Sequence, residues 1–286
     1  MRTVIRASVI VCVLALVPLP AAGQAQFTTI DYPGADATYA LGINPAGDIV
    51  GAFEDASGYH GFVFRNGNFS SFDYPDATWT EPRGISPQGD VVGMYGLSDN
   101  TVHGFLLRDG VLSNIDVPAQ PNTMPIKISP NGTIVGCYHV STPAGATILN
   151  TMYGFTRSAN GAVTSFPLER TMHNGVNASG DIAGIYFDPA GPVYSYAIRG
   201  GVMTTFAVPG SVTTRAWDIS ATGAIVGWHR NPTGFHGFLL RDGAFTSIDV
   251  PGAALTQAFG INPAGQIVGY FIDGTGAHGF LRVEQD

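Results

Sequence analysis

Residues 42–51 read GINPAGDIVG and residues 260–269 read GINPAGQIVG, so almost the same stretch occurs near both ends of the chain. Weaker copies lie between them, and every copy ends on a glycine that follows a pair of apolar residues. The six glycines are Gly51, Gly93, Gly136, Gly184, Gly227 and Gly269, spaced 42, 43, 48, 43 and 42 residues apart. A unit of this length cannot bury its apolar face alone, so we expect six units that stack or close into a ring.

Each unit contains four short strand patterns and no helical periodicity. In the first unit these patterns span 38–44, 48–53, 60–65 and 69–73. Four antiparallel strands in about 40 to 45 residues, repeated six times, predict an all-β fold of the six-bladed β-propeller type with four-stranded blades. We expect one propeller domain over residues 26–286. A pair of β-trefoils is the alternative fold.

The two ends of the chain hold the two halves of an incomplete unit. The chain begins with a fourth-strand pattern at 27–31 and ends with a third-strand pattern at 278–282. If the N-terminal strand pairs with the C-terminal strand, the sixth blade is complete and the ring is closed. An open stack of repeats would not need this division.

A histidine opens the third strand pattern and an aspartate follows the fourth in four of the units. The pairs are His60 with Asp73, His103 with Asp116, His236 with Asp249, and His278 with Asp31. In the first three pairs a two-residue turn places the histidine opposite the aspartate, and the last pair joins the chain ends. We predict cross-strand hydrogen bonds that act as structural clasps. Catalytic His–Asp dyads are the alternative interpretation.

The tripeptide His-Gly-Phe opens the third strand pattern in the same four units, at 60–62, 103–105, 236–238 and 278–280. Together with the GINPAG stretches, it resembles the HAF-type probable extracellular repeats of bacteria, which are named for a His-Ala-Phe tripeptide. The resemblance covers nearly all of the chain after residue 25. It implies an exported bacterial repeat protein and assigns no catalytic residue. The third and fourth units depart from the pattern, with Tyr-Gly-Phe at 153–155 and Tyr-Ser-Tyr at 194–196.

The N-terminus has the features of a signal peptide over residues 1–25: two arginines, a short apolar core and small residues near Ala22. We therefore expect a secreted or periplasmic protein without a membrane span after cleavage. Cleavage would remove two of 13 basic residues and none of 21 acidic ones, leaving 11 against 21 and a formal charge of −10. Such a charge disfavours nucleic acid as a partner. We expect a monomer, and no motif predicts a metal or cofactor.

Connections between the strands of a blade alternate between two sides of the molecule. The tight turns after the first and third strands share one side, here called the turn side. The longer connections share the other, the loop side, where a binding function is expected because loops vary over a rigid scaffold. The extra residues of the third unit, at 139–150, belong to this side.

The start of each first strand should surround the mouth of the central channel on the loop side, and there the repeat is irregular. The candidate ligand-binding residues are Glu81, Arg83, Lys127, His173, Arg215, Trp217 and Asp218. Arginine and lysine in an acidic protein could attract a small anion or an acidic sugar, and Trp217 could stack on a ring. Solvated rim residues with weak ion pairs are the alternative.

The leading functional hypothesis is an exported binding or interaction module whose partner is a glycan, a small anionic ligand or a protein. A propeller enzyme, a hydrolase or lyase for a carbohydrate or small anion with Glu81 or Asp218 as acid or base, is the second hypothesis. A structural cell-surface repeat protein is the third. The sequence leans away from an enzyme without excluding one.

Overall fold

The computed structural model describes residues 25–120, 122–140, 151–191 and 193–285, and this part of the chain forms 24 β-strands. In chain order they are β1 (Gln26–Ile30), β2 (Ala37–Ile43), β3 (Ile49–Asp55), β4 (Gly58–Arg65), β5 (Asn68–Phe72), β6 (Trp79–Ile85), β7 (Val91–Gly96), β8 (Val102–Arg108), β9 (Val111–Asn114), β10 (Asn122–Ile128), β11 (Ile134–His139), β12 (Met152–Arg157), β13 (Val163–Glu169), β14 (Thr171–Val176), β15 (Ile182–Phe187), β16 (Val193–Arg199), β17 (Val202–Phe206), β18 (Thr213–Ile219), β19 (Ile225–Asn231), β20 (Gly234–Arg241), β21 (Ala244–Ile248), β22 (Leu255–Ile261), β23 (Ile267–Ile272) and β24 (Ala277–Val283). The all-β prediction is confirmed for these residues.

Antiparallel ladders join the strands in groups of four. The groups are β2–β5, β6–β9, β10–β13, β14–β17 and β18–β21, and β22, β23 and β24 form one more with β1. We call these groups units 1 to 6. Short parallel contacts between some of them merge the strands into a 16-stranded and an 8-stranded sheet, neither of which closes on itself.

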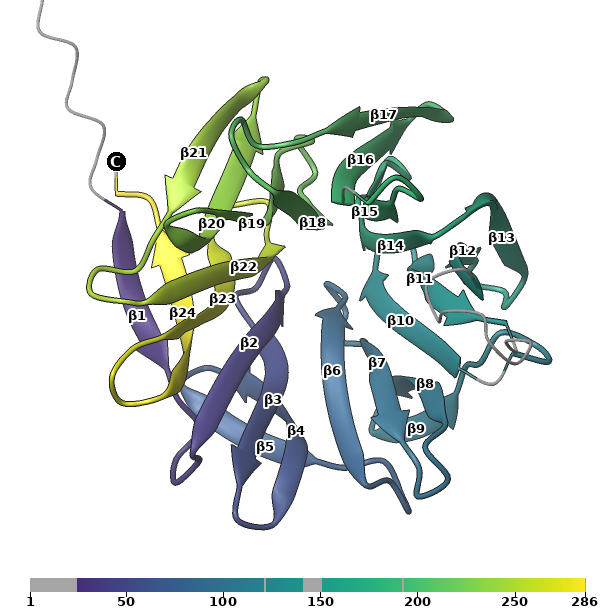
Figure 1. The fold of residues 1–286 in the computed structure, drawn as a ribbon. Helices are drawn as coiled ribbons and strands as arrows, with labels where there is room; N and C mark the ends of the chain where they lie inside the picture. Colours follow the sequence, from purple (N-terminus) through teal and green to yellow (C-terminus); the bar gives the residue numbers. More distant parts are fainter. Residues whose placement is uncertain (1–24, 121, 141–150, 192, 286) are drawn as a thin grey trace, which may run out of the picture.

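The first strands of the units surround a common centre, and later strands lie farther out (Figure 1). These first strands pack in the order β2, β6, β10, β14, β18 and β22, and β22 packs in turn against β2. The predicted contact between the chain ends is present: β1 pairs with β24, with Phe27 opposite Arg282. On the turn side, the side-chain amide of Asn262 donates to the backbone carbonyl oxygen of Asn44 at 3.1 Å and links the sixth unit to the first.

A β-bulge explains the six signature glycines. Each first strand shifts register once, as between Ala40 and Gly42 in unit 1. The bulge presses the backbone of the first strand onto the second, so that a Cβ on Gly51 would collide with the Tyr39 carbonyl oxygen. The other five signature glycines meet the equivalent carbonyl in the same way. The repeat is therefore recognisable because its backbone leaves no room for a side chain there.

The third-to-fourth strand turns are mostly of the predicted kind. Asn66 and Gly67 have φ angles of 51° and 78°, the left-handed pair that a two-residue hairpin needs. Unit 3 differs, because Arg157 pairs with Val163 and a five-residue loop lies between them. Asn160 and Gly161 lie within this loop, so unit 3 lacks the two-residue turn that follows the third strand in units 1, 2, 4 and 5.

A threonine connects each first strand to the segment before it. Thr38 Oγ1 accepts a hydrogen bond of 3.0 Å from the amide of Tyr32, which follows the fourth strand of the neighbouring unit. The same bond recurs at Thr80, Thr123, Thr214 and Thr256, while Thr171 accepts from Gly154 instead. Apolar side chains of adjacent units pack together, as Ile30 and Val268 do with Ile43. The predicted signal peptide and most of the extra segment at 139–150 lie outside the described residues.

Candidate functional site

Two layers of side chains from the first strands surround the centre on the loop side. The outer layer, here the mouth ring, comes from the residue after each conserved threonine: Tyr39, Glu81, Met124, Met172, Arg215 and Gln257. The deeper layer, here the inner ring, lies two residues farther on: Leu41, Arg83, Ile126, Asn174, Trp217 and Phe259. Most members of both layers line the two pockets described next. The chemistry at each of these two positions of the repeat thus varies between units, although units 3 and 4 both place a methionine in the mouth ring.

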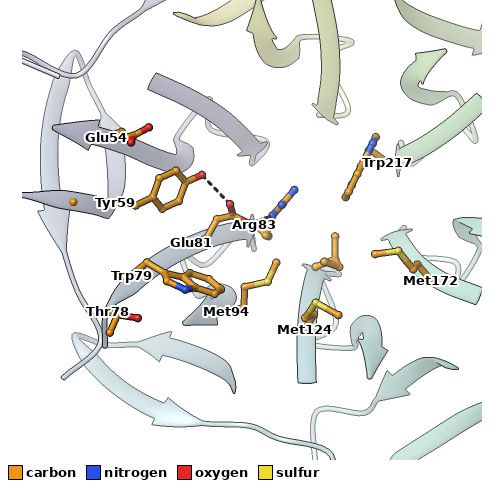
Figure 2. Close-up of a pocket in the computed structure, with 12 residues that line it drawn as sticks. Glu54, Tyr59, Thr78, Trp79, Glu81, Arg83, Met94, Met124, Met172 and Trp217 are labelled. Carbon is orange, nitrogen blue, oxygen red and sulfur yellow. Dashed lines mark hydrogen bonds and ion pairs between the residues drawn. The ribbon is translucent and has the colours of Figure 1, made fainter. Parts of the chain in front are cut away.

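The larger pocket, the mouth pocket, has a volume of about 620 Å³ (Figure 2). Its lining residues are Glu54, Gly58, Tyr59, Thr78, Trp79, Glu81, Arg83, Met94, Met124, Ile126, Met172 and Trp217. A second pocket of about 220 Å³ shares Tyr59, Glu81, Arg83 and Trp217 with it. Because of these shared walls the two pockets adjoin. Glu81, Arg83 and Trp217 therefore lie together, as the sequence predicted.

A chain of polar contacts crosses the mouth pocket from unit 1 to unit 5. The Tyr59 hydroxyl donates to Glu81 Oε2 at 2.8 Å, and Glu81 Oε1 pairs with Arg83 Nε. The Arg83 guanidinium then lies over the Trp217 ring, 5.2 Å from its centre. Burial and the Glu81 charge raise the pKa of Tyr59, which keeps its hydroxyl protonated and donating. These contacts with one another hold the four side chains in one orientation.

Lys127 and Asp218 do not belong to this mouth, and the prediction that they do is wrong. Lys127 Nζ lies 2.8 Å from Asp218 Oδ2. Both side chains are buried beside a cavity of about 70 Å³ that also contacts the turn-side prolines Pro45 and Pro130. The other four units have glycine at this position of the repeat. The pair crosses the centre next to Gly175, below both rings of side chains.

The other hydrogen bonds of the Asp218 carboxylate also lie inside the protein. The carboxylate accepts the backbone amides of Ile219 at 2.9 Å and Ile261 at 3.0 Å. Burial raises the pKa of Asp218, while Lys127 and the two amides oppose the shift. The Asp218 carboxylate thus has three donors and does not line the mouth pocket. It cannot contact a ligand bound in that pocket, so it cannot act as an acid or base on such a ligand.

His173 is also outside the pocket. The residue is 1% exposed, and its Nδ1 lies 2.6 Å from the Tyr196 hydroxyl inside unit 4. Alanine or proline occupies this position in the other five units. Burial lowers the pKa of His173 to about 4, so the ring is neutral near pH 7. The expectation that His173 faces a ligand is wrong because the neighbouring residue, Met172, takes the place in the mouth ring.

Arg215 is in the mouth ring, and no carboxylate in the described part of the chain pairs with it. Its guanidinium lies 5.0 Å from the ring centre of Trp228 and 5.4 Å from that of Phe187. Its Nε is buried and has no hydrogen-bond partner within the described ranges. Burial lowers the pKa of Arg215, as expected for a cation without a nearby anion.

The four predicted His–Asp contacts are all present. The distances from histidine Nδ1 to the aspartate are 2.8 Å at His60, 2.7 Å at His103, 2.8 Å at His236 and 2.9 Å at His278. A hydroxyl that the sequence analysis missed occupies the other ring nitrogen in each case: Ser57, Thr101, Thr233 and Thr275. The sequence feature that could have predicted these hydroxyls is the Asp/Asn-x-Ser/Thr turn just before each histidine. With both nitrogens engaged, these histidines are poorly placed for proton transfer to a substrate.

Sequence reasoning also missed part of the pocket wall. Tyr59 comes from a third strand, β4, and Met94 from a second strand, β7, while Trp79 opens the first strand β6; only the structure brings these three to the mouth. In the portions of the chain that are described, no group of three or more His, Cys, Asp or Glu side chains could hold a metal ion. No helix in those portions is long and apolar enough to cross a bilayer.

Comparison with known proteins identifies relatives by structure alone. No protein-family model and no curated protein sequence matches the chain. A gluconolactonase from Xanthomonas campestris superposes with a TM-score of 0.57 at 14% identity, over 92% of this chain and 91% of that chain. The Aleuria aurantia lectin in complex with Fucα1-6GlcNAc superposes with a TM-score of 0.54 at 12% identity, over 86% and 91%.

A further structure of the Aleuria aurantia lectin is described as a six-bladed β-propeller with a novel mode of fucose recognition. It has a TM-score of 0.51 at 12% identity and covers 91% of each chain. Identities this low indicate a shared fold rather than a shared activity. Together with the antiparallel groups of strands around one centre, the likeness shows that this chain has a β-propeller fold.

Proposed function

We propose that this chain is an exported six-bladed β-propeller that binds a sugar-sized ligand in the mouth pocket. The six antiparallel units would be the blades, with β1 completing the blade of β22, β23 and β24. Three contacts support the closed ring: the β1–β24 ladder, the parallel contact of Ala37 with Ala277, and the Asn262–Asn44 hydrogen bond. Export rests on the signal-peptide pattern and on the resemblance to HAF-type repeats.

One observation carries the ligand proposal: the preorganised chain Tyr59–Glu81–Arg83–Trp217 inside a pocket of about 620 Å³. Pockets for small molecules have volumes of roughly 300 to 1,000 Å³, with aromatic walls and a few oriented polar groups. The Glu81 carboxylate can accept from sugar hydroxyls and Arg83 can donate to them. The indole of Trp217 offers a surface for the apolar face of a pyranose ring.

The structural neighbours are consistent with this class of ligand. A fucose-binding lectin and a gluconolactonase both adopt the fold, and both of their names refer to sugars or sugar derivatives. Their low identity transfers no residue and no sugar to this chain. The support for a glycan is therefore the pocket chemistry, with the neighbours as precedent for the scaffold.

Hydrolysis or lysis of a bound sugar is the second candidate function, because Glu81 and Glu54 both line the mouth pocket. Glu81 is engaged by Tyr59 and Arg83, which suits a carboxylate that orients a ligand more than one that moves a proton. A structural surface repeat, the third hypothesis, would not need a preorganised polar chain inside a pocket.

The test is binding of the secreted protein to immobilised oligosaccharides that include fucosylated, galactosylated and uronic-acid-containing members, with product analysis on each hit. We expect binding without turnover, reduced at least tenfold by Trp217→Leu and Glu81→Gln. Arg108→Met is the matched control, because Arg108 pairs with Asp90 on the turn side. Binding that is equal in all variants would remove the mouth pocket as the site, and released product would favour the enzyme.

A further inference from the structure

The unsatisfied buried groups of the molecule gather in one corner of the mouth. Across the described ranges, five buried side-chain atoms lack a hydrogen-bond partner: Arg215 Nε, Trp217 Nε1, Trp228 Nε1, Asn174 Oδ1 and His229 Nδ1. The first three are N–H donors, Asn174 Oδ1 is an acceptor, and His229 Nδ1 donates or accepts according to its tautomer. Arg215 and Trp228 are directly opposite each other on β18 and β19, and Trp217 is two residues from Arg215. Buried polar groups normally have partners, so such a concentration of unmet donors requires an explanation.

Arg215 lies at the edge of the proposed ligand site. Its neighbours in the mouth ring are Met172, which lines the mouth pocket, and Gln257, which lines the adjoining one. Trp228, under the Arg215 guanidinium, also lines the adjoining pocket. Arg215 itself lines neither pocket, but it is partly exposed next to residues that do.

Among the residues that the structure describes, no acid forms an ion pair with Arg215. Glu81 is paired with Arg83, and Asp218 with Lys127. Asp188, next to Phe187, accepts the amide of Ala190 within its own turn. Arg230, farther along β19, adds a second positive charge and stacks on Phe235 at 5.5 Å. The charges around Arg215 thus leave it as a cation without a counter-ion.

Two aromatic rings, those of Phe187 and Trp228, lie against the Arg215 guanidinium. An arginine packed against rings loses less side-chain entropy on binding, and its planar fork matches two oxygens of one anionic group. Partial burial strengthens such a contact relative to one in water. The unmet atoms of Arg215, Trp217 and Trp228 all donate, so the group that complements these three is an acceptor, while Asn174 Oδ1 could accept from a hydroxyl of the same ligand.

We infer that Arg215 is an oxyanion subsite of the mouth pocket, so that the ligand is an acidic sugar with a carboxylate or a sulfate ester. This inference rests on the proposed function, since the ring of the same sugar would occupy the pocket beside Arg83 and Trp217. It also explains how an acidic protein can select an anion: the attraction comes from one local, partly buried cation.

The experiment compares methyl glucuronide, methyl glucoside 6-sulfate and methyl glucoside by calorimetric titration of the secreted protein. We expect at least one charged sugar to bind about tenfold or more tightly than the neutral one. Arg215→Met should abolish this preference and leave the affinity for the neutral sugar within about twofold. Arg230→Met is the matched control and should retain the preference. Equal affinity of the wild type for all three sugars would overturn the inference while leaving the proposed function intact.

A second measurement separates the two proposals if no sugar binds. Inorganic sulfate and acetate are compared with chloride at equal ionic strength by thermal unfolding of the wild type, Arg215→Met and Arg230→Met. The inference predicts an oxyanion-specific rise in Tm that Arg215→Met lacks and Arg230→Met keeps. The same Tm response in wild type and Arg215→Met would overturn it.

Discussion

His278 Nδ1 lies 2.9 Å from Asp31 Oδ2, although the two residues are 247 positions apart in the sequence. The same contact occurs within units 1, 2 and 5, where a short turn already connects the two strands. Between β24 and β1 there is no such turn, so the contact holds together two strands that only the fold brings near. Loss of the His278–Asp31 contact should therefore loosen β1 locally, whereas loss of any of the other three His–Asp contacts should not loosen its strand.

The first prediction concerns this terminal clasp. Asp31→Ala should lower the free energy of unfolding by about 1 kcal/mol, a modest value because Asp31 is half-exposed. It should also speed amide exchange selectively in β1, measured by hydrogen exchange with mass spectrometry. Asp73→Ala is the matched control, and its strand β5 should stay protected because the Asn66–Gly67 turn tethers it. Unchanged exchange of β1 in Asp31→Ala would contradict the prediction.

The second prediction concerns the buried ion pair. Lys127→Met should destabilise the protein by roughly 3 to 5 kcal/mol, because Asp218 would remain buried without its partner. Adding Asp218→Asn should restore much of this loss, measured by denaturant unfolding. Arg108→Met breaks an exposed pair with Asp90 and should cost less than about 1 kcal/mol. A double variant as unstable as Lys127→Met would show that the charge is not the cause.

The third prediction is a pH dependence set by His173. Its pKa in the folded state is about 4, below the ordinary value of 6.5, because burial disfavours the charged ring. The unfolded chain therefore binds an extra proton between pH 6.5 and pH 4, and stability falls as the pH falls through this window. The full loss is about 3 kcal/mol.

His173→Gln removes the titrating group, so its free energy of unfolding should change less than that of the wild type between pH 7 and pH 4. His229, whose pKa burial also lowers, contributes in the same direction in both proteins and cancels in the comparison. Parallel stability curves for wild type and His173→Gln would exclude His173 as the source of the pH dependence.

The fourth prediction tests the origin of the repeat signature. Gly51→Ala should destabilise the protein by roughly 3 kcal/mol or more, because the new Cβ collides with the rigid Tyr39 carbonyl. Gly67→Ala meets open space and has only the cost of a positive φ, about 1 kcal/mol. The Tm values of the two variants in thermal unfolding compare the cost of the steric collision at Gly51 with the cost of the positive φ at Gly67. A smaller effect at Gly51 than at Gly67 would be incompatible with the bulge as the cause.

Part of the mouth was predictable, and the β-bulge of the first strands accounts for the positions of Lys127 and Asp218, which were predicted wrongly. Glu81, Arg83, Arg215 and Trp217 occupy alternate positions of their strands, as side chains on one face do. Lys127 and Asp218 follow directly after the bulge, at a position that is glycine in the other units. They were predicted to lie at the mouth because they are next in sequence to inner-ring residues. In the structure they instead contact each other below both rings of side chains.

Local sequence determined the strands, the hairpin turns and the His–Asp register, because each depends on residues within one unit or on the spacing between units. The Asp31–His278 pair could be inferred in the same way, since repetition transfers the geometry of one unit to the divided one. Only the tertiary structure decided that Tyr59 joins Glu81, that Arg83 reaches across to Trp217, and that Arg215 has no acidic partner. Those features depend on side chains of different units, and the distances between them are set by how the units pack around one centre.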